Sequence, residues 1–355
     1  MKRQSGFSLV ELMVAITLAL LLTGAVISVF VGSRSAYEST AGVGAMSDSG
    51  RMALNLIGES VRSAGSLACN SAMTATSQNL VVNPAQFDRN FGQGVAGFEA
   101  NGTTPPAAIA QPAVPVVGAT NNWTPNLDPA VTGANPGQPV RGSDVLVLRS
   151  SVPRITPTYT TVDVAPGAAA LTVTPTLFAV AGNAYAAVSD CTKSVIFQVP
   201  VAVALGATAV TLNAGLPVGF SAGALVTPLT TTIYYIGVGS DGDSSLFRLE
   251  QVNGGPGFIN PAEELVPDIE NMQVLYGIDP TGTQTAAAYV PANQVAVGTN
   301  VVSIQVALLV ASPPAGKQVP AAAPYNLLGT QVTVPADNRS RQVFYATLNL
   351  RNAVN

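Results

Sequence analysis

The sequence predicts an α+β protein, in which one long N-terminal helix packs on an antiparallel β-sheet with extra strands and extended loops. Three observations predict this class. An apolar run near the N-terminus is followed by apolar residues at helical spacing. Beyond residue 65 the chain changes to alternating segments rich in Val, Ile and Thr. With 33 glycines, 26 prolines and 10% charged residues, the composition suits strands joined by irregular loops.

The first part of the helix is expected to lie in a membrane. Lys2 and Arg3 precede a stretch from Leu12 to Val31, 20 residues without a charge. Such a stretch gives about 30 Å of helix, which is enough to cross a bilayer core. Basic residues before the run predict that the N-terminus stays in the cytoplasm. We therefore expect a single-pass protein whose C-terminal domain lies on the far side of the membrane.

The helix is expected to continue past the membrane over residues 32–65. Apolar or small residues recur there at spacings of three and four and form one face: Met46, Gly50, Ala53, Leu54, Ile57, Val61 and Ala64. Gly65 is a suitable stop. Several glycines lower the helix propensity, so this half must depend on tertiary packing. The alternative is a separate helix after a break near Gly42-Val43-Gly44.

The rest of the chain, residues 66–355, is expected to form a β-rich domain. No internal repeat is evident. Three regions are predicted to be loops: 66–100, the irregular stretch 101–140 that contains Trp123, and the Pro/Ala-rich stretch 311–338. A short helix is predicted to begin at Asn260-Pro261 and to run through Glu264 and Leu265.

Predicted strands cover most of the remaining segments. Segments 233–238 and 245–250 flank Gly239-Ser240-Asp241-Gly242-Asp243-Ser244 and predict an antiparallel hairpin. Residues 301–310 are apolar enough for a central strand, and 342–350 alternate as a terminal strand with one buried face. The other predicted strands are 144–149, a β-rich region at 155–180, 194–199, 209–212, 224–226 and 269–276.

Composition excludes several kinds of function. There is no histidine, which removes Ser-His-Asp and Cys-His nucleophilic systems and most zinc sites. No carboxylate pair has a spacing that indicates hydrolysis, so we do not expect an enzyme. The net charge of −4 without a basic patch argues against nucleic acid. In an extracytoplasmic compartment Cys69 and Cys191 predict one disulfide, with two free thiols as the alternative.

We expect no cofactor, with calcium as the one candidate to consider. Asp241 and Asp243 lie in a short oxygen-rich loop of the kind that calcium binds. The full EF-hand spacing is missing, because no glutamate occupies the twelfth loop position. A plain hairpin turn is the favoured interpretation, and these two aspartates remain weak candidates.

The N-terminus contains a specific motif, Gly6-Phe7-Ser8-Leu9-Val10-Glu11, followed directly by the apolar run. This motif resembles the processing site of type IV prepilins and type II secretion pseudopilins. The resemblance implies that residues 1–6 are a leader, that a prepilin peptidase cuts between Gly6 and Phe7 and methylates Phe7, and that residues 7–31 form the membrane or filament-core helix. It also implies that Glu11 sets the register of assembly. The alternative is an uncleaved signal anchor.

Several downstream segments resemble PilW-type minor pilins and the related J-type minor pseudopilins. They are Gly142-Ser143-Asp144-Val145-Leu146, Asp190-Cys191, Ile233-Tyr234-Tyr235-Ile236, Leu246-Phe247-Arg248, Glu264-Leu265-Val266 with Tyr276-Gly277, and Arg341-Gln342-Val343-Phe344 running to Leu350-Arg351-Asn352. The resemblance implies a pilin-like fold and a minor pilin that primes or caps pilus assembly in a tip complex. Expected partners are other minor pilins, the major pilin, a tip adhesin, the prepilin peptidase and the inner-membrane assembly platform.

Three other functions remain open at this point. A J-type pseudopilin of a type II secretion system differs mainly in size, and the extended loops of this chain favour the pilus. A competence pseudopilus subunit would touch DNA, which the acidic balance disfavours. A membrane-anchored periplasmic enzyme would need a catalytic motif that the sequence does not show.

Overall fold

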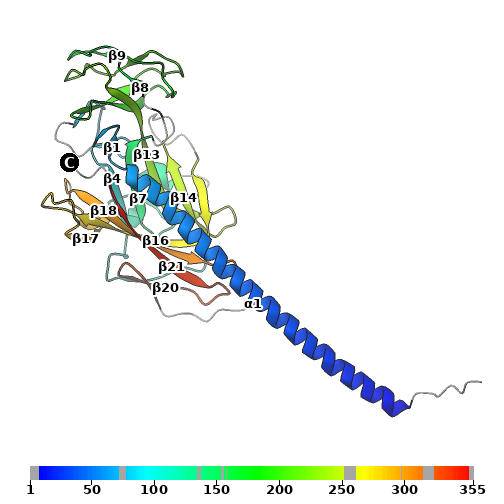
Figure 1. Cartoon of the computed structure of the whole chain (residues 1–355). Coiled ribbons are helices and arrows are strands. Elements are labelled where there is room, and N and C mark those ends of the chain that lie inside the picture. The colour runs from blue at the N-terminus through cyan, green and yellow to red at the C-terminus, as the bar shows by residue number, and fades with distance from the viewer. Residues whose placement is uncertain are drawn as a thin grey trace, which may run out of the picture.

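The structure is a computed structural model that describes residues 8–71, 77–133, 137–152, 156, 158–251, 261–296, 298–314 and 324–351. One helix, α1 (Leu9–Ser63), runs from the N-terminus into a β-rich domain (Figure 1). The predicted continuation of the helix past the membrane is confirmed, because α1 is a single helix of 55 residues; the alternative, a break near Gly42-Val43-Gly44, does not occur. An α+β fold with a long N-terminal helix and a strand-rich remainder is thus confirmed.

The larger sheet has ten strands within the described residues. Its main order is β3-β11-β10-β13-β7-β4-β6, with β8, β14 and β15 attached at the sides. Its strands are β3 (Ser77–Asn79), β4 (Val95–Ala100), β6 (Trp123–Thr124), β7 (Val145–Ser151), β8 (Thr158–Tyr159), β10 (Ala184–Ser189), β11 (Ser194–Val199), β13 (Leu225–Val238), β14 (Ser244–Glu250) and β15 (Glu263–Pro267). The predicted hairpin is confirmed as β13 and β14, with Tyr235 opposite Phe247.

The second sheet supports the helix. Its order is β17 (Ala288–Pro291), β16 (Ile269–Ile278), β18 (Val301–Ala311) and β21 (Arg341–Asn349), all antiparallel. The predicted central strand is confirmed, because β18 lies between two neighbours and is almost entirely buried. The main core lies between α1 and both sheets, and its cluster of buried residues includes Ile57 and Val61 of α1 together with Met272 and Ile304.

Two predicted strands are one strand in the structure. Residues 225–226 of the first segment and the whole of 233–238 belong to the 14-residue β13 (Leu225–Val238). Pro228 lies at the point where β13 changes partner, since Ala186 of β10 pairs with Pro228 and Ser151 of β7 pairs with Leu229. A proline has no backbone N–H to donate, so its presence in the sequence argues against one continuous central strand. Here the change of partner accommodates it.

The short helix predicted through Glu264 and Leu265 is wrong. Residues 263–267 form strand β15, and Asn260 lies outside the described residues. β15 pairs with β14, with Val266 opposite Leu246. The Glu264 carboxylate accepts hydrogen bonds from Ser245 Oγ at 2.7 Å and from the backbone N–H of Ser240 at 3.1 Å. These contacts with the β13–β14 hairpin favour an extended chain over a helical turn.

The regions predicted as loops contain strands that pair with one another. β4 lies within 66–100, together with the hairpin β1 (Ser66–Leu67) and β2 (Asn70–Ser71). β5 (Ala108–Ala110) pairs in parallel with β20 (Thr330–Thr333), which pairs with β19 (Tyr325–Leu327). Thus 101–140 and 311–338 share one small sheet. The described residues also include three short helices: η1 (Thr120–Asn122), α2 (Pro129–Thr132) and η3 (Ala292–Gln294).

The stretch around Trp123 is irregular but firmly packed. The Trp123 side chain is buried and donates from its indole nitrogen to the Ser143 carbonyl at 2.8 Å. Gly118 lies close to the ring, because a Cβ there would come within 2.3 Å of it. The loop is thereby held to the large sheet.

A repeat that the sequence analysis missed builds the end of the molecule around β8 and β9 (Figure 1). Val164-Ala165-Pro166-Gly167-Ala168 is followed 39 residues later by Val203-Ala204-Leu205-Gly206-Ala207. In the two copies, β9 (Ala170–Thr172) pairs antiparallel with β12 (Ala209–Thr211). The hydrogen bonds repeat as well: Val173 N–H donates to the Thr208 carbonyl, and Leu212 N–H to the Ala169 carbonyl, each at 2.9 Å. We call this two-fold-like unit, residues 158–181 and 200–224, the distal lobe.

Candidate functional site: the N-terminal helix and its attachment to the domain

The first half of α1 carries an exposed apolar surface. Side chains from Leu9 to Val31 are solvent-exposed, and this stretch is long and apolar enough to cross a membrane by length and composition. Its hydroxyl groups bond within the helix: Thr17 donates to the Val14 carbonyl and Thr23 to the Ala19 carbonyl, at 2.9 and 2.7 Å. Such internal bonding is what an apolar environment requires, because no water is available there.

Glu11 lies in the first turn of α1, where its carboxylate is exposed. Ser8 is the N-cap residue, and its carbonyl accepts from Leu12 N–H at 3.1 Å. The free N–H groups of a helix N-terminus favour a negative charge nearby. Among the described residues Glu11 makes no ion pair, and Gly6 and Phe7 lie outside them. The cleavage and methylation positions therefore stay predictions.

The second half of α1 docks on the domain through the predicted apolar face. Met46, Gly50, Ala53, Ile57 and Val61 are buried at spacings of three or four. The closest approach is at Gly50, where a Cβ would lie 2.5 Å from Cδ2 and 2.6 Å from Cγ of Phe344 in β21. A glycine is needed there because the helix and the strand lie too close for a side chain.

Hydrogen bonds fix the helix along its axis. The Ser60 hydroxyl and the Tyr234 hydroxyl of β13 lie 2.8 Å apart, and the Tyr234 hydroxyl donates to the Leu56 carbonyl at 3.3 Å. Burial raises the pKa of Tyr234, so its hydroxyl remains protonated and keeps this donor at neutral pH. The helix is therefore attached to both sheets.

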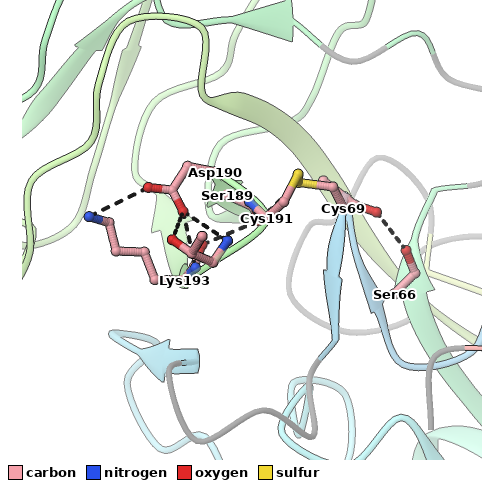
Figure 2. The surroundings of a disulfide bond; sticks show 8 residues. Ser66, Cys69, Ser189, Asp190, Cys191 and Lys193 are labelled. Atoms are coloured by element: carbon pink, nitrogen blue, oxygen red, sulfur yellow. Dashed lines mark hydrogen bonds and ion pairs between the residues drawn. A yellow bond between two sulfur atoms is a disulfide. The ribbon is translucent and has the colours of Figure 1, made fainter. Parts of the chain in front are cut away.

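A disulfide joins the end of the helix to the large sheet (Figure 2). Cys69 follows β1 of the hairpin after α1, and Cys191 lies in the turn between β10 and β11. Asp190 orders that turn by accepting from the backbone N–H groups of Thr192 and Lys193 at 3.1 and 3.0 Å. Burial opposes ionisation of Asp190, but these hydrogen bonds outweigh it and lower its pKa. Cys191 itself adopts the left-handed backbone conformation, with φ +68, and is exposed.

The two weak calcium candidates lie in the β13–β14 turn. The Asp241 carboxylate accepts from Asp243 N–H at 2.9 Å, as in a simple turn. The Asp243 carboxylate forms an ion pair with Arg339, which also contacts Asp268 at 3.0 Å. In the described parts of the chain no group of three or more His, Cys, Asp or Glu side chains could hold a metal ion. The Arg339 guanidinium thus occupies the position beside the Asp243 carboxylate that a bound cation would need.

Arginines that fasten the C-terminal strand were not foreseen. The Arg341 side chain is 4% exposed and contacts Glu270 at 2.7 Å and Asp337 at 2.6 Å. Burial alone would lower the pKa of Arg341, but the hydrogen bonds that its guanidinium donates to Asp337 and Glu270 raise it. Together with Arg339, it holds the strand on which α1 rests. The alternation of charges at 337, 339 and 341 was the available sequence signal, but the arginines' other partners, Glu270, Asp268 and Asp243, lie far away in the sequence.

Comparisons with known proteins agree with the motif and with the C-terminal segments. Residues 233–352 match the family model of type IV pilus-assembly protein W, and residues 1–27 match the prokaryotic N-terminal methylation motif. No curated protein matches the chain. Among solved structures, a type IV-like pilin from Thermus thermophilus is 19% identical, with a TM-score of 0.25; the match covers 36% of this chain and 70% of that one.

Proposed function

We propose that this type IV pilin-like protein, with a PilW-like region and an N-terminal methylation motif, is a minor pilin that primes or caps pilus assembly in a tip complex. It works by assembly rather than by catalysis. Residues 1–6 are the leader, 7–31 the membrane and filament-core helix, 32–65 the docked helix and 66–355 the periplasmic domain. Its partners are other minor pilins, the major pilin, a tip adhesin, the prepilin peptidase and the inner-membrane assembly platform.

The observation that carries this proposal is the division of α1 into two halves. Among the residues that the structure describes, the half up to Val31 joins none of the hydrophobic core and exposes apolar side chains, whereas the half from Met46 to Val61 is fixed to both sheets. A helix attached in this way can leave the lipid and enter a bundle of like helices without unfolding the domain. Little hydrophobic free energy is lost in that transfer, since both surroundings are apolar.

In this mechanism Glu11 sets the axial position of the subunit relative to its neighbours in the bundle. A carboxylate in an apolar bundle is costly unless it is paired, by about 2.5–3.5 kcal/mol on insertion scales. The new N-terminal amine of Phe7, on the same or a neighbouring subunit, is the proposed partner. Pairing then favours one axial position over the others.

Exchange of Glu11 tests this step. Glu11→Ala should insert into the membrane normally but be recruited poorly into the tip complex, measured by co-purification with the other minor pilins. Glu38→Ala is the matched control, because Glu38 lies on the same helix beyond the apolar run and pairs with Arg34. Recruitment of Glu11→Ala at the level of the control would refute the role of Glu11 while leaving processing untouched.

The N-terminus of the protein purified from its own membranes tests the processing. Mass spectrometry should find a chain that starts at N-methylated Phe7. A chain that starts at Met1, or one cut beyond Val31, would remove the filament function. Co-purification with pilus components would then support the minor pilin, whereas co-purification with secretion components would indicate a J-type pseudopilin.

A further inference from the structure

Two carboxylates are buried together where the large sheet meets the second sheet, β17-β16-β18-β21. Glu99 lies in β4 and Asp144 just before β7, and they are 1% and 2% exposed. One oxygen of Asp144 accepts from Ala100 N–H, beside Glu99, and the other from Val274 N–H of β16, each at 2.9 Å. The Thr103 hydroxyl lies 3.3 Å from Glu99 Oε1. The pair therefore ties β4 to β16.

No positive side chain compensates for this pair within the described residues. Neither carboxylate has an ion pair there, and their other neighbours are neutral. Ala292 N–H of η3 donates to Glu99 Oε2 at 3.2 Å, the Thr104 side chain lies near Glu99, and the Tyr276 hydroxyl of β16 is buried beside both carboxyls without a hydrogen-bond partner. Two buried negative charges at such a site repel each other and have lost their hydration.

We propose that the Glu99–Asp144 pair holds one proton in the folded protein, which makes the contact between the two sheets sensitive to pH. Asp144 keeps the charge, because each of its oxygens accepts a backbone N–H. Glu99 keeps the proton and donates it to Thr103 Oγ1, whose own hydrogen goes to the Ala100 carbonyl at 2.7 Å. Release of the proton to solvent leaves two carboxylates in one dry site and drives β4 and β16 apart. This inference is independent of the role in assembly.

The direction of the pH effect follows from linkage. Burial raises the pKa of both carboxyls above their ordinary values near 4. The folded chain thus holds a proton that the unfolded chain has already released. The stabilisation is complete below about pH 4 and is lost as the pH rises toward the folded-state pKa. Within this window each pH unit increases the unfolding equilibrium constant by up to about tenfold for one proton.

Glu99→Gln is the discriminating variant. Its Oε1 can accept from Ala292 N–H and its Nε2 can donate to Thr103 Oγ1, so it reproduces the protonated acid. Urea unfolding of the full chain in detergent, followed by Trp123 fluorescence at pH 5 to 8, should show that the unfolding constant of the wild type rises with pH. Glu99→Gln should lose most of this rise. Glu263→Gln, at an exposed carboxylate paired with Arg248, is the control and should keep it.

Three results would overturn the proposal. The first is the same pH dependence in Glu99→Gln and the wild type. The second is stabilisation of the wild type by calcium chloride at pH 8 that Glu99→Gln lacks, which would mean that the carboxylates hold a metal ion instead of a proton. The third uses the wild type alone, so that it is independent of whether the variant folds: the absence of an infrared band of a protonated carboxylic acid at pH 7.

Discussion

Alanine substitutions at three glycines of α1 test how the helix rests on the sheet. A methyl group added at Gly44 would have no atom within 4 Å, one at Gly58 would have Leu348 Cδ2 at 3.2 Å, and one at Gly50 would have Phe344 Cδ2 at 2.5 Å. The three sites share one helix and one chemical change. They differ in what the added methyl group meets.

The magnitudes follow from two opposing effects. Replacing glycine by alanine within a helix stabilises it by about 1 kcal/mol. Overpacking a core costs about 1–3 kcal/mol. At Gly50 the clash includes Phe344 Cγ at 2.6 Å, near the base of the ring, so rotation of the ring tip cannot relieve it. We expect Gly44→Ala to raise the free energy of unfolding by about 1 kcal/mol, Gly58→Ala to change it little, and Gly50→Ala to lower it by up to about 2 kcal/mol.

Equilibrium urea unfolding of the full chain in detergent measures these changes, with circular dichroism to show that the helix is intact. Phe344→Leu in the Gly50→Ala background should restore part of the loss, because it removes the clashing ring. If Gly50→Ala stabilised the protein as much as Gly44→Ala, the close contact of α1 with β21 would be refuted.

Three further predictions concern attachments within the domain. Replacing Cys69 and Cys191 by serine should lower the free energy of unfolding by about 2–4 kcal/mol, and dithiothreitol should do the same to the wild type but not to the variant. Arg341→Met should cost about 3–5 kcal/mol because it leaves the Glu270 carboxylate without its partner; a loss below about 1 kcal/mol in thermal or urea unfolding would contradict this. Trp123→Phe should cost about 1–3 kcal/mol through the Ser143 carbonyl left unpaired, whereas an unchanged urea midpoint would show that this bond contributes little.

Local patterns in the sequence were enough to predict the helix and the long strands. The buried face at Met46, Ala53 and Ile57 follows the helical period, and β18 is a long apolar run. Predictions failed where structure depends on distant pairing. β13 contains a proline at its partner change, and β5 is a strand only because β20 lies beside it.

The candidate site, too, was predictable only where its residues are contiguous in the sequence. The motif that ends at Glu11 is contiguous, so the sequence alone is enough to find it. Glu99 and Asp144 come together only through the pairing of β4 with β7, and Asp144 alone suggested nothing more than the start of a strand. The repeat in the distal lobe was overlooked because its copies share small residues at common spacing and little else.

The disulfide gives the molecule a short mechanical connection. A pull on α1 passes from Ser63 to Cys69 and crosses directly to Cys191, although these cysteines are 122 residues apart in the chain. From Cys191 it enters the β10–β11 turn, whose strands carry the hydrophobic core of the distal lobe. Tension between the exposed part of α1 and the distal lobe is thus borne by a covalent bond, in parallel with the hydrogen bonds of the large sheet. A force applied to α1 can therefore move the whole domain without separating the strands of the large sheet one after another.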